Sequence, residues 1–258
     1  MIAYIKGFFR YRFLLEELVK KGIKLKYRRS YLGIVWSLIE PILTTIVLVI
    51  VFGTLFNNTN PTFPLYIICG RLIYSFFSAG TKAASNSIRK NAGMIKKVYV
   101  PKYLHPLSDV IFNYLIFLIS LLVLILVALY TRTAPTILIW QCIPALILVL
   151  LLTIGVGMFL VTLNVFFRDM EYLWNVILML IMYMSAIFYY PERILSSGFA
   201  WVLRYNPLYC IIDIFRGGII GYMSDPWNYG YAFCFSVLAV ILGTYVFKKK
   251  QDDFILQL

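Results

Sequence analysis

Three stretches rich in Lys and Arg interrupt an otherwise apolar chain, and their spacing restricts what the chain can fold into. Nine basic residues precede the first long apolar run, six lie between residues 81 and 105 without any Asp or Glu, and three follow the last apolar run as Lys248–Lys250. Short segments rich in Lys and Arg stay on the cytoplasmic side of a membrane. We therefore expect all three stretches on that side, which requires an even number of spans and places both chain ends in the cytoplasm.

The apolar runs between these stretches are long enough to be membrane spans. Of the 258 residues, 62% are hydrophobic and 14% are charged, so the chain has more apolar surface than a soluble domain can bury. About 20 apolar residues in a helix cross the ~30 Å hydrocarbon core of a bilayer. The sequence thus predicts an all-α, polytopic membrane protein that forms a single transmembrane domain over residues 1–258. Its six expected spans are residues 33–56, 63–80, 107–130, 137–166, 172–189 and 227–247.

Three further segments are expected to be helical without crossing the membrane. Residues 1–30 alternate apolar and basic positions at helical spacing, which is typical of an amphipathic helix in the membrane interface. Residues 85–98 are predicted to form a short, basic cytoplasmic helix. Residues 191–226 are apolar but cut by Pro and Gly, which indicates a re-entrant helical hairpin on the outer side, between spans five and six. The net charge of +13 fits contact with anionic lipid headgroups better than binding of nucleic acid.

The chain lacks the residues of a self-contained enzyme or metal site. Its four cysteines have no CxxC spacing, His105 is its one histidine, and the Gly-Lys pair of a phosphate-binding loop never occurs. We expect no metal and no cofactor in this chain, so ATP and Mg would be bound by a separate subunit. One enzymatic alternative is that His105 and Asp109 form half of a lipid-phosphatase site. Such a site needs a second histidine, so a polar start to the third span is the better interpretation.

Several sequence motifs follow one another in a fixed order along nearly the whole chain. They are KYRRSYLGIVWSLIEP (residues 26–41), IRKNAGMIKKVYVP (88–101), LNVFFRD (163–169), SAIFYYP (185–191) and YNPL (205–208), with Arg216 beyond. In this order they closely resemble the membrane subunit of ABC-2 type transporters that export polysaccharides such as O-antigen, capsule or teichoic-acid chains. The chain departs from that family's pattern at Ala186, where Pro is usual, and at Arg71, within the apolar second span.

The resemblance implies a transport subunit that does not itself catalyse a reaction. A second copy would pair with it to form a channel, two ATP-binding cassette subunits would dock beneath, and a lipid-linked polysaccharide would cross the bacterial plasma (inner) membrane. Residues 85–98 would be the coupling helix and residues 1–30 a gate helix beside the ATPase. From the residues alone, a basic loop held to lipid headgroups explains 85–98 equally well. The expected contacts with the ATPase are Arg89, Lys90, Asn91, Met94, Lys96 and Lys97.

Aromatic side chains are expected to form the wall of the substrate path. Sugar rings pack their C–H faces on aromatic faces, while phenol and indole groups offer hydrogen bonds to hydroxyls. An aromatic belt at the membrane interface is the alternative for Trp36, Trp174, Tyr189 and Tyr190, whereas Tyr183 lies in mid-span, where a belt residue does not belong. The expected channel residues are Trp36, Phe52, Tyr74, Trp174, Tyr183, Phe188, Tyr189 and Tyr190.

Three arginines are candidate contacts for the pyrophosphate of a lipid-linked substrate. Arg71 lies within the second span, where an ionisable residue indicates function, unless the span is shifted so that Arg71 snorkels to the interface. Arg28 and Arg29 adjoin the first span. For the whole chain, O-antigen export is the favoured function. The alternatives left open are export of teichoic acid, capsule or small lipids, and, less favoured, a membrane enzyme acting on lipid-linked sugars.

Overall fold

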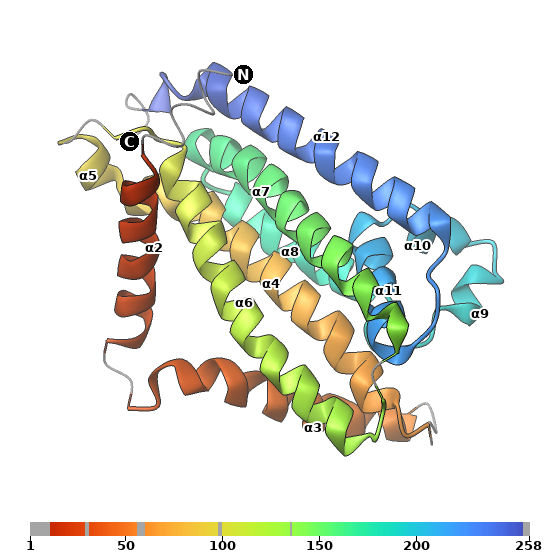
Figure 1. The fold of residues 1–258 in the computed structure, drawn as a ribbon. Helices are drawn as coiled ribbons and strands as arrows, with labels where there is room; N and C mark the ends of the chain where they lie inside the picture. Colours follow the sequence, from red (N-terminus) through yellow and green to blue (C-terminus); the bar gives the residue numbers. More distant parts are fainter. Residues whose placement is uncertain (1–10, 29–30, 56–59, 98–99, 135, 255–258) are drawn as a thin grey trace.

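The fold is a bundle of helices (Figure 1). The computed structural model describes residues 11–28, 31–55, 60–97, 100–134 and 136–254. All regular secondary structure in these ranges is helical, which confirms the predicted all-α class. The helices are α2 (Arg12–Tyr27), η1 (Gly33–Val35), α3 (Trp36–Leu55), α4 (Phe63–Lys90), α5 (Ala92–Ile95), α6 (Leu104–Tyr130), η2 (Ile137–Gln141), α7 (Cys142–Phe166), α8 (Met170–Tyr183), α9 (Glu192–Leu195), α10 (Ala200–Arg204), α11 (Pro207–Ile220) and α12 (Pro226–Lys250).

Among the described residues, five helical segments are long and apolar enough to cross a membrane. They are η1 with α3, then α4, α6, η2 with α7, and α12. The polytopic membrane architecture is therefore confirmed. The fifth predicted span, 172–189, is shorter than expected, because α8 has 14 residues and reaches only about 21 Å at ~1.5 Å per residue. The chain leaves the helix after Tyr183, and Ala186 has a φ of 47°, which an α-helix cannot accommodate.

The centre of the bundle is α4, which packs against α3, α6, α7, α8 and α11. Beside α4, α7 packs along α12 (Figure 1). The backbones of α7 and α12 approach closely at a pair of glycines. A Cβ on Gly155 would lie 2.4 Å from the backbone of Ala239 and Val240, and a Cβ on Gly243 would lie 2.2 Å from the carbonyl oxygen of Gly155. Small residues at such crossings allow membrane helices to gain van der Waals contact.

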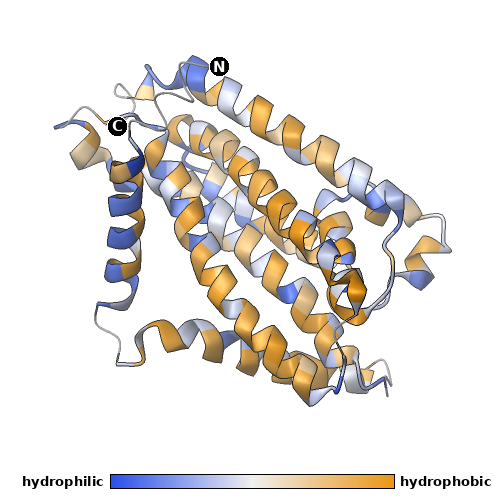
Figure 2. Ribbon diagram, viewed as in Figure 1, coloured by the Kyte–Doolittle hydropathy of each residue, from blue (hydrophilic) through white to orange (hydrophobic). Residues whose placement is uncertain are grey.

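Two of the basic stretches, around α5 and at the end of α12, lie at one end of this bundle (Figure 1). The C-terminal ends of α4, α7 and α12 meet there, beside α5 (Figure 1). Figure 2 shows hydrophilic residues on α2 and at this end, with hydrophobic residues over the middle of α3, α6 and α7. A small apolar cluster closes the same end. It contains Ile88, Ile95, Met158, Val161, Val165, Phe247 and Phe254.

The expected coupling helix over residues 85–98 is not a separate helix. Residues 85–90 are the last turns of α4, which continues ten residues beyond the predicted end of span two at residue 80, and only α5 follows. Gly80 lies within α4 and does not end it. Its lack of a side chain lets α7 pack closely, since a Cβ at Gly80 would lie 2.6 Å from Thr153 Cγ2. Farther along, Asn164 Nδ2 of α7 donates to the Ser85 carbonyl at 3.0 Å. Residue 98 lies outside the described residues.

The other two segments predicted not to span are residues 1–30 and residues 191–226. In the described part of residues 1–30, α2 lies against α6 and buries Leu15 and Val19. The chain then turns into α3 at Gly33, whose φ of 50° suits glycine (Figure 1). The expected hairpin over residues 191–226 contains three helices, α9, α10 and α11, of which α11 is the longest. Helix α11 is largely buried against α4, α7 and α12, and the Asn206 side chain caps it by accepting from the backbone N–H of Leu208 at 3.0 Å.

Candidate substrate path

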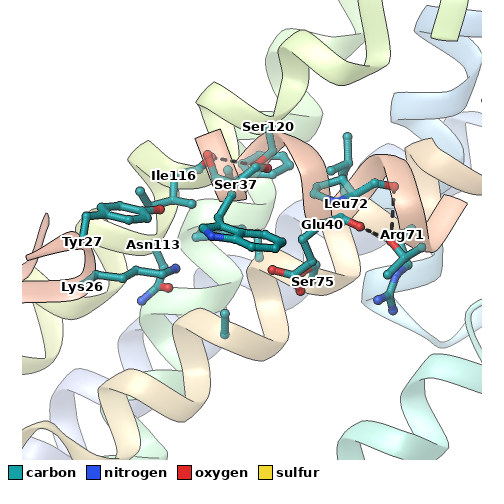
Figure 3. Close-up of a pocket in the computed structure, with 16 residues that line it drawn as sticks. Lys26, Tyr27, Ser37, Glu40, Arg71, Leu72, Ser75, Asn113, Ile116 and Ser120 are labelled. Carbon is teal, nitrogen blue, oxygen red and sulfur yellow. Dashed lines mark hydrogen bonds between the residues drawn. The ribbon is translucent and has the colours of Figure 1, made fainter. Parts of the chain in front are cut away.

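Two adjoining pockets open between α3 and its neighbours, and both are lined by Thr44 and Arg71. The first pocket, of about 260 Å³, lies between α3, α4, α6 and the end of α2 (Figure 3). The second lies between α3, α4, the end of α8 and the segment that follows it. Arg71 therefore stands where a polar pocket meets an apolar one.

The first pocket is the more polar of the two, with a cationic group at each end. Lys26 lies at one end and Arg71 at the other, with hydroxyl, amide and carboxylate groups between them (Figure 3). Such cations and hydroxyls are the groups that bind phosphate oxygens in proteins. The indole of Trp36 also lines this pocket. The polar groups between the two cations are Ser37, Glu40, Thr44, Ser75, Asn113 and Ser120.

The second pocket has an aromatic wall. Phe52 and Phe188 stack with ring centroids 4.8 Å apart and an interplanar angle of 5°. Tyr183 meets the edge of this stack, 6.4 Å from Phe188, and 54% of the Tyr183 side-chain surface is exposed. Besides Thr44 and Arg71, the rest of the lining is apolar, from Leu43, Val47, Leu48 and Met182. This surface can accept the C–H face of a sugar ring.

The other predicted channel aromatics lie outside these two pockets. Tyr74 and Trp174 are buried in the contact between α4 and α8. The Tyr74 hydroxyl donates to the Leu178 carbonyl at 2.9 Å, and Trp174 Nε1 donates to Thr81 Oγ1 at 3.0 Å. Trp174 also borders a separate, mostly apolar groove between α7, α8 and α10. Tyr189 donates to the Tyr183 carbonyl at 2.7 Å, and Tyr190 packs on the ring of Tyr66 at 4.7 Å.

The residues expected to contact an ATPase lie around α5. Arg89 reaches Asn164 Oδ1 at 3.5 Å, and Asn91 donates to the Ser87 carbonyl at 2.8 Å. Lys90, Lys96 and Lys97 are exposed, and Met94 is half-buried. Ile95 is buried in the apolar cluster at this end of the bundle, so α5 is anchored while the lysines that flank it are exposed.

Of the three arginines suggested for a pyrophosphate, Arg71 lines both pockets. Arg28 is exposed and does not line either pocket, and Arg29 lies outside the described residues. Lys26, at the end of α2, supplies the cation at that end of the first pocket, although it was not among the predicted pyrophosphate contacts. Its side chain also lies 5.7 Å from the Phe112 ring on α6. The signal that could have singled it out is its position one turn before the α2–α3 bend.

A polar cluster at the other end of the bundle was not predicted from the sequence. Asp213 on α11 accepts hydrogen bonds from the Tyr222 hydroxyl at 2.9 Å and Asn228 Nδ2 at 2.9 Å, and a third from the Ser224 hydroxyl. It thereby fastens the connection from α11 to α12. Within the described part of the chain, no group of three or more His, Cys, Asp or Glu residues is placed to hold a metal ion. The four cysteines are free thiols.

Comparison with known proteins gives consistent matches over most of the chain. A family described as ABC-2 type transporter matches residues 14–220. An O-antigen export system permease protein RfbA of Klebsiella pneumoniae is 28% identical over 246 residues, covering 93% of each chain. The RfbA protein of Myxococcus xanthus is 25% identical over 259 residues, covering 98% of each chain. The polysialic acid transport protein KpsM of Escherichia coli is 21% identical over 260 residues, covering 95% of this chain and 96% of its own.

Proposed function

This chain belongs to the ABC-2 type transporter family, and we propose that it is the channel-forming permease subunit of an ATP-driven exporter of a lipid-linked polysaccharide, with O-antigen as the first candidate. The relatives named as O-antigen export permeases support this choice over capsule or teichoic acid. The observation that carries the proposal is the junction at Arg71 of a polar pocket with an aromatic one.

The two pockets suit the two chemical parts of such a substrate. A pyrophosphate headgroup would bind in the first pocket, where Lys26 and Arg71 supply charge-assisted hydrogen bonds. The sugars next to it would stack on Phe52, Tyr183 and Phe188 in the second. A series of weak stacking contacts lets a long glycan slide, because no single site holds it tightly.

A second copy of the chain would complete the path. One side of α3 and much of α8 expose large apolar side chains, and Tyr183 lies on that surface. Membrane lipids or a second copy must cover it, since both remove apolar groups from water. A second copy would also close the open side of the aromatic pocket. The exposed residues are Leu43, Val47 and Ile50 of α3, and Tyr172, Val176, Leu180 and Tyr183 of α8.

Two ATP-binding subunits would supply the energy at the end of the bundle that carries α5. The exposed Lys90, Lys96 and Lys97 are the proposed contacts, and ATP and Mg would be held by those subunits. This end, with Lys248–Lys250, is then the cytoplasmic one, in a bacterial inner membrane. Rigid contacts through Ile95 would carry ATPase closure into α4 and α12.

Reconstitution tests this function directly. The chain and its ATP-binding partner are placed in liposomes with lipid-linked O-antigen, and glycan that becomes accessible to an added glycosidase on the far side is measured. ATP-dependent transfer is expected, and capsule and teichoic-acid precursors serve as comparison substrates. Transfer of small lipids alone would favour the drug-or-lipid exporter alternative. Phosphatase or glycosyltransferase turnover by the purified chain alone would replace the transport function with the enzymatic one.

A further inference from the structure

The segment from Met184 to Tyr190, which carries the aromatic wall, is irregular backbone inside the protein. It follows the end of α8, and its residues 185–188 are buried. Ala186 has a φ of 47°, in the left-handed region that a residue with a Cβ enters at a cost. Irregular backbone at membrane depth is stable only where its polar groups find partners within the protein. The partners of this segment therefore determine where Phe188 lies.

Side chains from other helices supply those partners. Asn206, the cap of α11, donates to the Met184 carbonyl at 3.0 Å. The Tyr66 hydroxyl lies 3.1 Å from the Ala186 carbonyl and 2.9 Å from the Tyr189 carbonyl. The remaining partner is Arg216 of α11, which donates from Nη2 to the Ile187 carbonyl at 3.2 Å.

Arg216 is itself buried and held in place by Tyr66 of α4. Its side chain is 1% exposed, its Nε donates to the Tyr66 carbonyl at 3.1 Å, and its guanidinium carbon lies 3.5 Å from the centre of the Tyr66 ring. A buried guanidinium is costly unless its donors are satisfied, so such a group is weak evidence for stability and better evidence for a specified geometry. Carbonyls 150 and 29 residues away in the chain accept these bonds, which join α4, the 184–190 segment and α11.

Gly70 makes this arrangement possible. A Cβ at Gly70 would lie 2.6 Å from Arg216 Nη2 and 3.3 Å from its guanidinium carbon, but 3.5 Å from the Ile187 Cα, which is ordinary contact. An alanine at this position would therefore displace the end of a flexible side chain and leave the helix backbones in place. The structure thus offers a way to move the guanidinium without removing it.

We propose that Arg216 is a positioning residue for the substrate path, which holds the 184–190 segment so that Phe188 stacks on Phe52 and the stacked pair blocks the path at rest. Ile187, whose carbonyl Arg216 binds, directly precedes Phe188, so loss of that bond frees the ring that forms the stack. The functional part of this inference rests on the proposed channel, whereas the positional part does not.

The positional part is tested by hydrogen exchange on the full chain in lipid nanodiscs. Gly70→Ala and Arg216→Lys are compared with the wild type and with Gly230→Ala, a helical glycine of α12 with open space around it. Losing a charge-assisted hydrogen bond should make exchange at residues 184–190 about tenfold faster in both variants. Exchange in α7 and α12 should stay unchanged, and Gly230→Ala should match the wild type. Unchanged exchange at 184–190, or faster exchange throughout the bundle, would overturn the proposal.

The functional part is tested by resting permeability. Liposomes that hold the complete transporter without ATP are loaded with a small polar dye, and its leakage is measured per transporter. Gly70→Ala and Arg216→Lys should leak several-fold faster than Gly230→Ala, because the Phe52–Phe188 stack no longer blocks the path. Local exchange without extra leakage would overturn the role in closure. Failure of the proposed function itself would show separately, as absence of ATP-driven glycan transfer by the wild type, and the exchange comparison would still decide the positional part.

Discussion

Arg71 is the residue on which recognition of the lipid headgroup depends in this account. It lines both pockets, and its removal would cost about 1.5–3 kcal/mol of binding to a phosphate oxygen. We expect Arg71→Gln to raise the KM for lipid-linked polysaccharide by about 10- to 100-fold, with Arg71→Lys in between. Arg204→Gln, which alters an exposed arginine of α10, is the control. An unchanged KM in reconstituted transport would remove Arg71 from the headgroup site.

Tyr183 and Trp36 are the exposed aromatic residues whose rings we expect to touch sugar. Changing either to Ala should reduce surface glycan strongly while protein levels stay normal, whereas Tyr183→Phe should retain most export because the ring face is kept. Tyr245→Ala provides a matched control, since Tyr245 is an exposed tyrosine of α12 outside both pockets. Normal export by the two Ala variants would contradict the lining role. Quantitative immunoblots of surface glycan and of the protein give both readings.

At the level of elements, α5 is the proposed entry point for ATPase movement. Lys96→Glu together with Lys97→Glu should leave ATP hydrolysis by the complex but make it insensitive to substrate, because the exposed surface directly after α5 would repel its partner. Lys249→Glu adds the same kind of charge at the same end of the bundle and should behave like the wild type. ATPase activity with and without substrate is the measurement. Normal coupling in the double variant would place the docking surface elsewhere.

The contact between α7 and α12 should be the one least tolerant of added volume. Gly155→Ala would place a methyl group 2.4 Å from the α12 backbone, and backbone cannot swing aside as a side chain can. We expect a loss of at least about 1–3 kcal/mol of stability, seen as a lower midpoint of thermal unfolding in detergent. Gly230→Ala, on the open side of α12, should be nearly neutral. Equal midpoints for the two variants would show that the helices separate easily.

The limits of some helices could be predicted from the sequence, and those of others could not. Hydropathy and basic stretches predicted the spans because burial in lipid requires long apolar runs, and α6, α7 and α12 match those predictions closely. The same signal could not see that α4 continues to Lys90, since its last turns are held by Asn164 of α7. Hydropathy also could not predict that α8 ends at Tyr183. That end depends on side chains of α4 and α11, which bind the backbone carbonyls of the segment after α8.

For the whole molecule, composition indicated aromatic wall residues but not which helix contact each would enter. Phe52, Tyr183 and Phe188 meet in one pocket, whereas the hydroxyl of Tyr74 and the indole N–H of Trp174 find partners between α4 and α8. That difference depends on the rotation of each helix, which a uniformly apolar run does not encode. Motif order along the chain was more informative, since the family match over residues 14–220 confirmed it.

The passage of glycan along the aromatic pocket can be measured by site-specific photocrosslinking during export. A photoreactive amino acid replaces Tyr183 in one strain and Tyr245 in another, both positions being exposed. Illumination during active export should attach glycan to the chain at position 183 and not at position 245. Absence of glycan adducts at 183, or equal adducts at both positions, would contradict a path that runs between α3 and α8.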